Sequence, residues 1–108
     1  MITLLKDFPW IATGTSTWTS PWVHYPAELG DCEFWVVGET HNTGTATVQL
    51  QTSVDGASEV DAGTATAVAS AIPDSTPVDV QGTMVCVQIS STGDALMTLS
   101  VYLVPKQS

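Results

Sequence analysis

The chain has 108 residues, and 11 Asp and Glu against 2 Lys give it a formal net charge of -9. This length allows one domain and not two. Because proteins that bind phosphates use Lys and Arg to displace counterions, the charge excludes nucleic acid as a partner and disfavours an anionic membrane surface. The composition is also rich in hydroxyls, with 16 Thr and 10 Ser. Thr and Val at this density predict an all-β protein.

Residues 1 to 31 hold three of the four Trp and have prolines at positions 9, 21 and 26. Proline removes a donor from a strand ladder and holds the preceding residue in an extended conformation. We therefore expect an extended N-terminal arm over residues 1 to 31, with at most an edge strand around Thr15 to Val23.

From Cys32 the pattern becomes that of regular strands. Residues 32 to 39 are nearly continuously apolar, which predicts a central strand covered on both faces. Residues 45 to 54 alternate, with Val54 on the apolar face, and predict a strand with one solvated face. Asp55-Gly56 then predicts a hairpin turn.

The second half of the sequence contains two further clear strands. Residues 57 to 71 read as a loop with a weak strand near 64 to 68, and Pro73 to Pro77 read as a turn. Residues 83 to 90 and 95 to 104 both alternate and predict a closing antiparallel hairpin. With six to eight strands in total, we expect a single antiparallel β-sandwich or jelly-roll-like domain over residues 32 to 108.

The residue types for catalysis are few. His24 and His41 belong to no motif with a known mechanism, and both fit solvated loops. Asp55, Glu59 and Asp61 form a carboxylate-rich loop that lacks the residue order of a helix-loop-helix calcium site. The sequence therefore predicts a protein that is not an enzyme, with no catalytic residues, no cofactor and no bound metal.

Two further features concern the cellular compartment. Cys32 and Cys86 each lie in an apolar run that suits a buried, inert thiol, and a disulfide between them remains an alternative. The N-terminus has no basic start followed by a long apolar stretch, so we expect no secretion signal, and no run is long enough for a membrane helix. We therefore expect the protein to be made in a cytoplasm.

The aromatic side chains of the first third need a partner surface, because each large ring buries 150 to 250 Å² or so when it packs. Two destinations are open, the chain's own sandwich, considered chiefly for Trp18 and Trp22, and a neighbouring subunit, favoured for Phe8 and Trp10. Stacking on sugar rings is a third use. The candidate interface residues are Phe8, Trp10, Trp18, Trp22 and Tyr25.

The segment from Thr45 to Gly56, the segment from Met84 to Gly93 and the alternating last strand together resemble small β-sandwich virion proteins of tailed bacteriophages. The resemblance covers residues 45 to 104. It implies a head-decoration or capsid-stabilising protein on the outer capsid surface of a virion, made in the host cytoplasm. It also implies partners, namely further copies of the chain, with a trimer as one candidate, and a major capsid protein reached through the aromatic arm.

Two other functions fit the same residues. A carbohydrate-binding or host-attachment module would use exposed Trp and Tyr side chains as a stacking platform. A tail or fibre component is the second alternative.

Overall fold

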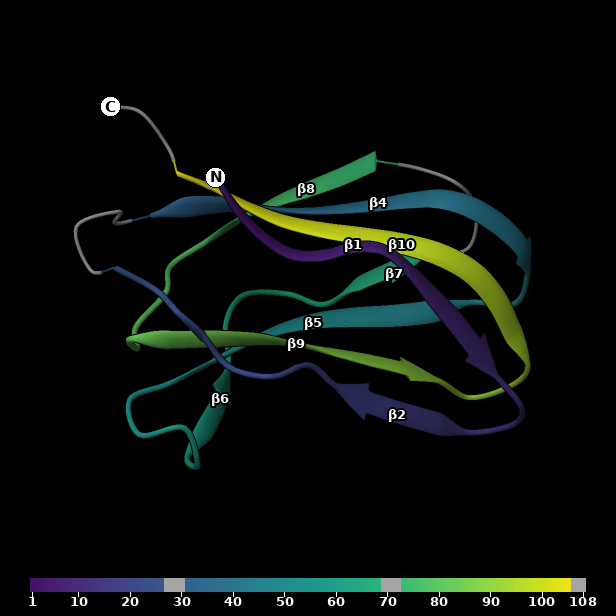
Figure 1. The fold of residues 1–108 in the computed structure, drawn as a ribbon, viewed down its shortest axis with the longest axis horizontal. Coiled ribbons are helices and arrows are strands. Elements are labelled where there is room, and N and C mark those ends of the chain that lie inside the picture. Colours follow the sequence, from purple (N-terminus) through teal and green to yellow (C-terminus); the bar gives the residue numbers. More distant parts are fainter. Residues whose placement is uncertain (27–30, 69–72, 106–108) are drawn as a thin grey trace.

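The fold is built from strands alone. A computed structural model describes residues 1–26, 31–68 and 73–105, which form ten strands and no helix. The strands pair in two antiparallel sheets that face each other across one core (Figure 1). The prediction of a single all-β antiparallel sandwich is confirmed.

Each sheet has its own set of strands. The spatial order in sheet A is β1 (Ile2–Ala12), β10 (Ala95–Pro105), β4 (Cys32–Thr43) and β8 (Pro73–Val78). Sheet B has the order β2 (Ser16–Thr19), β9 (Met84–Ser91), β5 (Ala46–Ser53) and β6 (Glu59–Asp61). In sheet B, β3 (Val23–His24) also pairs with β9, and β7 (Thr66–Val68) also pairs with β5.

The strand order is that of a jelly roll. Strands β2 and β3 pair with successive parts of β9, and β6 and β7 pair with successive parts of β5, so each pair of short strands acts as one. Counted in this way, sheet A holds the first, eighth, third and sixth strands, and sheet B holds the second, seventh, fourth and fifth. This interleaving of two Greek keys is the jelly-roll arrangement.

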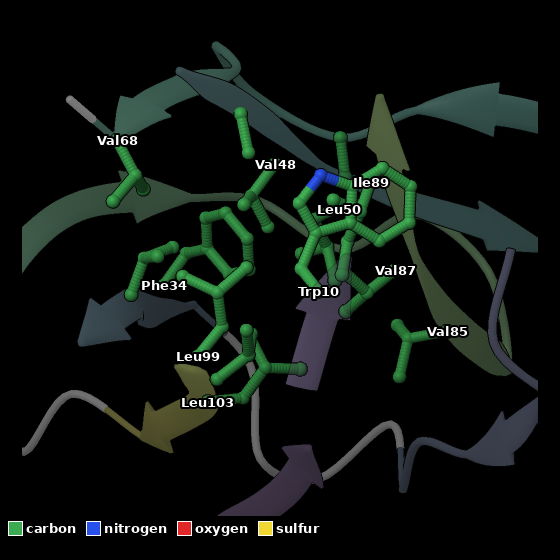
Figure 2. Close-up of a cluster of buried hydrophobic side chains, with 14 of the residues drawn as sticks. Trp10, Phe34, Val48, Leu50, Val68, Val85, Val87, Ile89, Leu99 and Leu103 are labelled. Atoms are coloured by element: carbon green, nitrogen blue, oxygen red, sulfur yellow. The ribbon is translucent and has the colours of Figure 1, made fainter. Parts of the chain in front are cut away.

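The core lies between the sheets and follows from the alternation of the long strands. Successive side chains of a strand point to opposite faces, so every second residue of β5, β9 and β10 enters the core. Trp10 and Phe34 lie among these aliphatic side chains (Figure 2). The largest fully buried side chains are Tyr25, Phe34, Leu50, Ile89, Met97, Leu99, Leu103, Val36, Val48, Val68, Val85 and Val87.

The N-terminal segment is extended, as expected, but it is not an arm apart from the sandwich. β1 pairs with β10 along its length, and Trp10 is 5% exposed and belongs to the core. β2 and β3 add to the edge of sheet B. The expected boundary at residue 31 was therefore wrong for residues 1 to 26, because β1, β2 and β3 are strands of the two sheets, and Trp10 and Tyr25 lie in the core.

The prediction that residues 83 to 90 and 95 to 104 pair as a closing hairpin was also wrong. β9 pairs with β2, β3 and β5 in sheet B, whereas β10 pairs with β1 and β4 in sheet A, so the turn after Ser91 crosses from one sheet to the other. Alternation predicts which face of a strand is buried but not which strand lies beside it.

Three local predictions differ from the structure. The expected turn over Pro73 to Pro77 is strand β8, which tolerates proline because it lies at the edge of sheet A. β5 ends at Ser53, so Val54 leaves the apolar face and is exposed. β4 is central in its sheet, but only one of its faces is covered, since Trp35 and Val37 are half-buried. The weak strand near 64 to 68 is present as β7.

Substitutions at two adjacent positions of β1 test whether the N-terminal segment belongs to the core. Trp10→Ala should destabilise the protein by about 3 to 5 kcal/mol, because it removes a buried ring. Ile11→Ala should change stability by no more than about 0.5 kcal/mol, because Ile11 is 71% exposed. Urea unfolding of both variants measures the difference. Equally small effects would place β1 outside the cooperative core.

Candidate functional site

Two of the five aromatic candidates are unavailable to a partner. The indole Nε1–H of Trp10 donates to Ser91 Oγ at 2.8 Å inside the core. Tyr25 is 2% exposed, and burial, together with a hydrogen bond to Cys32, raises the pKa of its phenol. The prediction of an intersubunit role for Trp10 and the assignment of Tyr25 as an interface residue were therefore wrong, because the chain itself fills the space around both rings.

Two more candidates close the edge of the sandwich. Phe8 of β1 and Trp18 of β2 stack with their ring centroids 4.4 Å apart and their planes 24° from parallel. β1 and β2 are edge strands of different sheets, so this stack joins sheet A to sheet B. Both rings are half-buried and pack against the core. Both rings therefore close this edge of the sandwich. For Trp18 this is one of the two destinations considered from the sequence, packing on the chain's own sandwich.

Trp22 is the remaining candidate, and it lies outside the core cluster. It is half-buried beside the turn that follows β5, where a Cβ atom on Gly56 would come within 3.9 Å of its ring and within 3.5 Å of Met84 Sδ. Trp22 thus stands next to the surface described below.

A groove of about 270 Å³ lies at this end of sheet B, between the turn after β5 and the loop before β9. Val54 and Val60 are 69% and 58% exposed on its walls. The lining is almost wholly apolar, although several of its residues carry hydroxyl or amide groups that turn away from it. The lining residues are Thr52, Ser53, Val54, Ser58, Val60, Gln81 and Gly82.

The loop before β9 is held against β5 by hydrogen bonds. Thr52 Oγ1 accepts from the amide of Gly82 at 3.1 Å and donates to the carbonyl of Met84 at 2.9 Å. A Cβ atom on Gly82 would lie within 2.7 Å of the backbone of Ser53, so only glycine allows the loop to come this close. The groove floor is therefore fixed by backbone contact.

The opposite wall is organised by Asp55. Its Oδ1 accepts from the amides of Ala57 and Ser58 at 2.8 and 2.7 Å and from Ser53 Oγ at 3.0 Å, and its Oδ2 accepts from Ser58 Oγ. These hydrogen bonds, above all those from the Ser58 and Ala57 amides, hold the pKa of Asp55 well below its usual range. The hairpin turn predicted at Asp55-Gly56 is confirmed, with Gly56 at φ 78°.

Exposed carboxylates belong to the segments that form the groove, and Asp55 is hydrogen-bonded to its lining residues Ser53 and Ser58. Asp55 and Glu59 are exposed beside Val54 and Val60, and Asp61 follows Val60. Asp79 accepts a hydrogen bond from Gln81, which lines the groove. In the described part of the chain Lys6 is the one Lys or Arg side chain, and it lies on the outer face of sheet A.

The sequence did not single out this groove. Its lining comes from three segments between residues 52 and 82, and the pattern placed Val54 in the core. The available signal was Val60, an apolar residue between Glu59 and Asp61 in a strand too short to bury it.

A second polar cluster lies on the outer face of sheet A. Register shifts in β1 between Thr3 and Phe8 accompany Asp7 at φ 51°, and the amide of Asp7 donates to Ser100 Oγ at 3.0 Å. Lys6 Nζ lies 3.4 Å from Glu39 Oε1 and 3.3 Å from the hydroxyl oxygen of Tyr102.

The two carboxyl groups of this cluster share a hydrogen bond. That bond raises the pKa of Asp7, whereas hydrogen bonds from Asp7 and Ser100 lower the pKa of Glu39. The hydrogen bond to Tyr102 and the two nearby carboxylates raise the pKa of Lys6. Paired carboxyls can act as acid and base in catalysis, but none of these side chains lines the groove.

Both cysteines are buried and free. Cys32 points into the core near Tyr25, whereas Cys86 lies on the opposite face of sheet B and contacts Gln51 Oε1 at 3.7 Å. Burial, with a smaller effect of Glu59, raises the pKa of the Cys86 thiol to about 11. The alternative of a disulfide is excluded because the two thiols point to different faces.

The remaining His, Cys, Asp and Glu side chains that are described do not gather into a metal site. Within residues 1–26, 31–68 and 73–105, no group of three His, Cys, Asp or Glu side chains is arranged to hold a metal ion. His24 is exposed in β3 rather than in a loop, and the side chain of His41 lies outside the described residues. The described segments include no helix long and apolar enough to span a membrane.

Comparison with protein-family models, with curated proteins and with solved structures gives no match to this chain. Function is therefore inferred from the residues and their geometry.

Replacing Asp55 tests whether its carboxylate holds the turn. In Asp55→Ala the amides of Ala57 and Ser58 should exchange with deuterium roughly tenfold faster, because they lose their acceptor. Since the folded pKa of Asp55 is depressed, its stabilising effect is present above the unfolded pKa near 4 and is lost as the pH falls through the folded value. Thermal unfolding should therefore separate Asp55→Ala from the parent at pH 7 more than at pH 2. Glu59→Gln is the control, and equal exchange rates in all three proteins would contradict this role.

Replacing Asp7 tests the shared hydrogen bond of the second cluster. The raised pKa of Asp7 means that its neutral form suits the folded state, so its contribution is present at low pH and is lost as the pH rises through the folded value. Asn is neutral, can donate to Glu39 and tolerates positive φ. Asp7→Asn should therefore raise the melting temperature at pH 7, with a gain that shrinks toward pH 3. Asp7→Ala should lower it at both pH values, and a lower melting temperature for Asp7→Asn at pH 7 would refute the assignment.

Proposed function

We propose that the chain is a non-enzymatic structural protein of a bacteriophage virion, which decorates or stabilises the outer capsid surface. The observation that carries the binding role is the open apolar groove between Val54 and Val60. The resemblance of residues 45 to 104 to small virion proteins supplies the virion context.

The chemistry of the groove favours a protein partner over a small substrate. Sites for small polar molecules hold a few converging polar groups that fix the orientation of the ligand. The groove instead offers two exposed valines and a floor held by the hydrogen bonds of the Thr52 hydroxyl with the Gly82 amide and the Met84 carbonyl. Such a surface fits an apolar side chain at the centre of a protein interface.

The jelly-roll fold is compatible with a role in a virion. Jelly rolls occur in viral capsid proteins and in lectins, and one fold hosts many functions. Attachment through a detached aromatic arm is not compatible with the burial of Trp10 and Tyr25. We therefore assign attachment to the rigid groove end of the sandwich, with a major capsid protein as the partner.

Self-association belongs to this proposal, with contacts through sheet faces. The sheet edges carry features that oppose strand addition, including Pro9 and the register shifts in β1, Pro77 in β8, and the shortness of β6. Ile11 and Leu96 are cross-strand partners, 71% and 39% exposed on the outer face of sheet A. They supply an apolar contact for a homo-oligomer, a trimer among the candidates.

A carbohydrate-binding or host-attachment module is the second candidate, and the position of Trp22 favours it. Trp22 is the one of the five aromatic candidates that is absent from the core cluster and its packed neighbours. A half-exposed indole at the surface can stack on a sugar ring. Tail or fibre attachment would use the same groove on a different virion component.

Binding to purified capsid shells that lack the protein tests the proposal. The parent chain should sediment with the shells, and Val54→Ser/Val60→Ser should bind more weakly by roughly a hundredfold or more, because burial of each valine contributes about 1.5 to 3 kcal/mol. Trp22→Ala should bind as the parent does. Loss of glycan-array binding in Trp22→Ala, with no shell binding by the parent, would replace this proposal with the carbohydrate module, and binding to purified tails alone would move it to the tail.

A further inference from the structure

We propose that the groove binds a segment of a partner protein in which an apolar side chain is flanked by Lys or Arg. The inference rests on the proposed function in taking the groove as the attachment surface, and it adds the chemistry of the partner. Two independent features of the groove carry it, namely its apolar lining and the exposed carboxylates of the segments that form it.

The apolar walls select the centre of the partner segment. Val54 and Val60 are the exposed apolar residues that line a space of about 270 Å³, which is comparable to one or two large aliphatic side chains. Asp55 fixes the turn that presents Val54, and the loop at Gly82 is held on Thr52. Because the groove is already formed, little conformational entropy is lost when it is filled.

The carboxylates select the flanks of the partner segment. Asp55, Glu59, Asp61 and Asp79 are all exposed, and Asp55 and Asp79 are hydrogen-bonded to residues that line the groove. Glu59 is the register partner of Ser53 and precedes Val60, so its charge lies at the end of sheet B that carries the groove. No Lys or Arg among the described residues compensates these charges, since Lys6 lies on sheet A with Glu39 and Asp7. An apolar segment with basic flanks is the occupant that satisfies both features.

The same charges argue against a second copy of the chain as the occupant. With a net charge of -9, a copy brings acidic surface to an acidic rim. Its Lys6 is already paired with Glu39 at 3.4 Å. Like charges that face each other across an interface oppose association, so the groove selects a different and basic partner.

Two synthetic peptides probe this chemistry. One has two central leucines flanked on each side by two lysines, and the other has glutamates in place of the lysines. In NMR titrations of the isotope-labelled full chain, the lysine peptide should shift the amide signals of Val54, Val60 and Gly82, and the glutamate peptide should not. Binding of the lysine peptide should weaken as NaCl rises from about 50 to about 200 mM, because exposed charges are screened.

Matched variants separate the two features. Val54→Ser/Val60→Ser should bind the lysine peptide more weakly by roughly a hundredfold or more, and the control Ile11→Ser, on sheet A, should bind within about twofold of the parent. Glu59→Gln/Asp79→Asn should bind several-fold more weakly and depend less on salt. All of these side chains are exposed, so folding is retained.

Four results would overturn the inference. They are equal binding of the glutamate peptide, shifts that centre on another face, parent-like binding by the double serine variant, and no binding of the lysine peptide. If the lysine peptide binds as expected while capsid shells fail to bind the parent, the capsid role is wrong and the partner chemistry stands. If shells bind through the two valines while the lysine peptide does not bind, the partner chemistry is wrong and the capsid role stands.

Discussion

The hydrogen bond from Trp10 to Ser91 sets the two sheets of this sandwich in register. Trp10 belongs to β1 in sheet A, and Ser91 ends β9 in sheet B. The Ser91 hydroxyl in turn donates to the carbonyl of Thr45 at 3.1 Å, just before β5 begins. One buried indole N–H therefore joins β1, β9 and the start of β5, and an unpaired polar group at this depth would cost more than a weak bond contributes. The cross-sheet stack of Phe8 on Trp18 adds a second link at the same edge.

The groove depends on this alignment through sheet B. β9 carries the loop at Gly82 at its beginning, and β5 carries the turn at Asp55 at its end, so the pairing of Ser53 with Met84 brings the two walls together. Trp10, Phe8 and Trp18, which the sequence suggested as interface residues, thus contribute to the groove indirectly. They hold the strands whose ends form it.

Strand faces could be predicted from the sequence, and strand neighbours could not. The alternation in β9 and β10 indicates their buried sides correctly, because period-two burial is a property of one strand alone. The partner of each strand depends on which sheet completes the core, and a turn between two alternating strands looks the same whether it stays in a sheet or crosses to the other. The burial of Trp10 has the same cause, since the Ser91 hydroxyl that its indole meets lies 81 positions away in the sequence. The groove was hidden for a different reason. A hydrogen-bonded turn at Ser53 and Asp55 ends β5 one residue before the apolar pattern does, and that residue is Val54.

The acidic residues that give the net charge of -9 are not evenly distributed over the surface. Asp55, Glu59, Asp61 and Asp79 lie around the groove end, and Asp31 lies close enough to Tyr25 and Cys32 at the same end to act on their pKa values. At the far end the turn before β10 carries Asp94, which accepts from the amide of Gly14 (Figure 1). Among the described residues, the exposed carboxylates are therefore concentrated toward the groove end. In the field of a basic surface the molecule would turn its groove forward before any contact forms, so that orientation is selected during the diffusional approach and most strongly at low ionic strength.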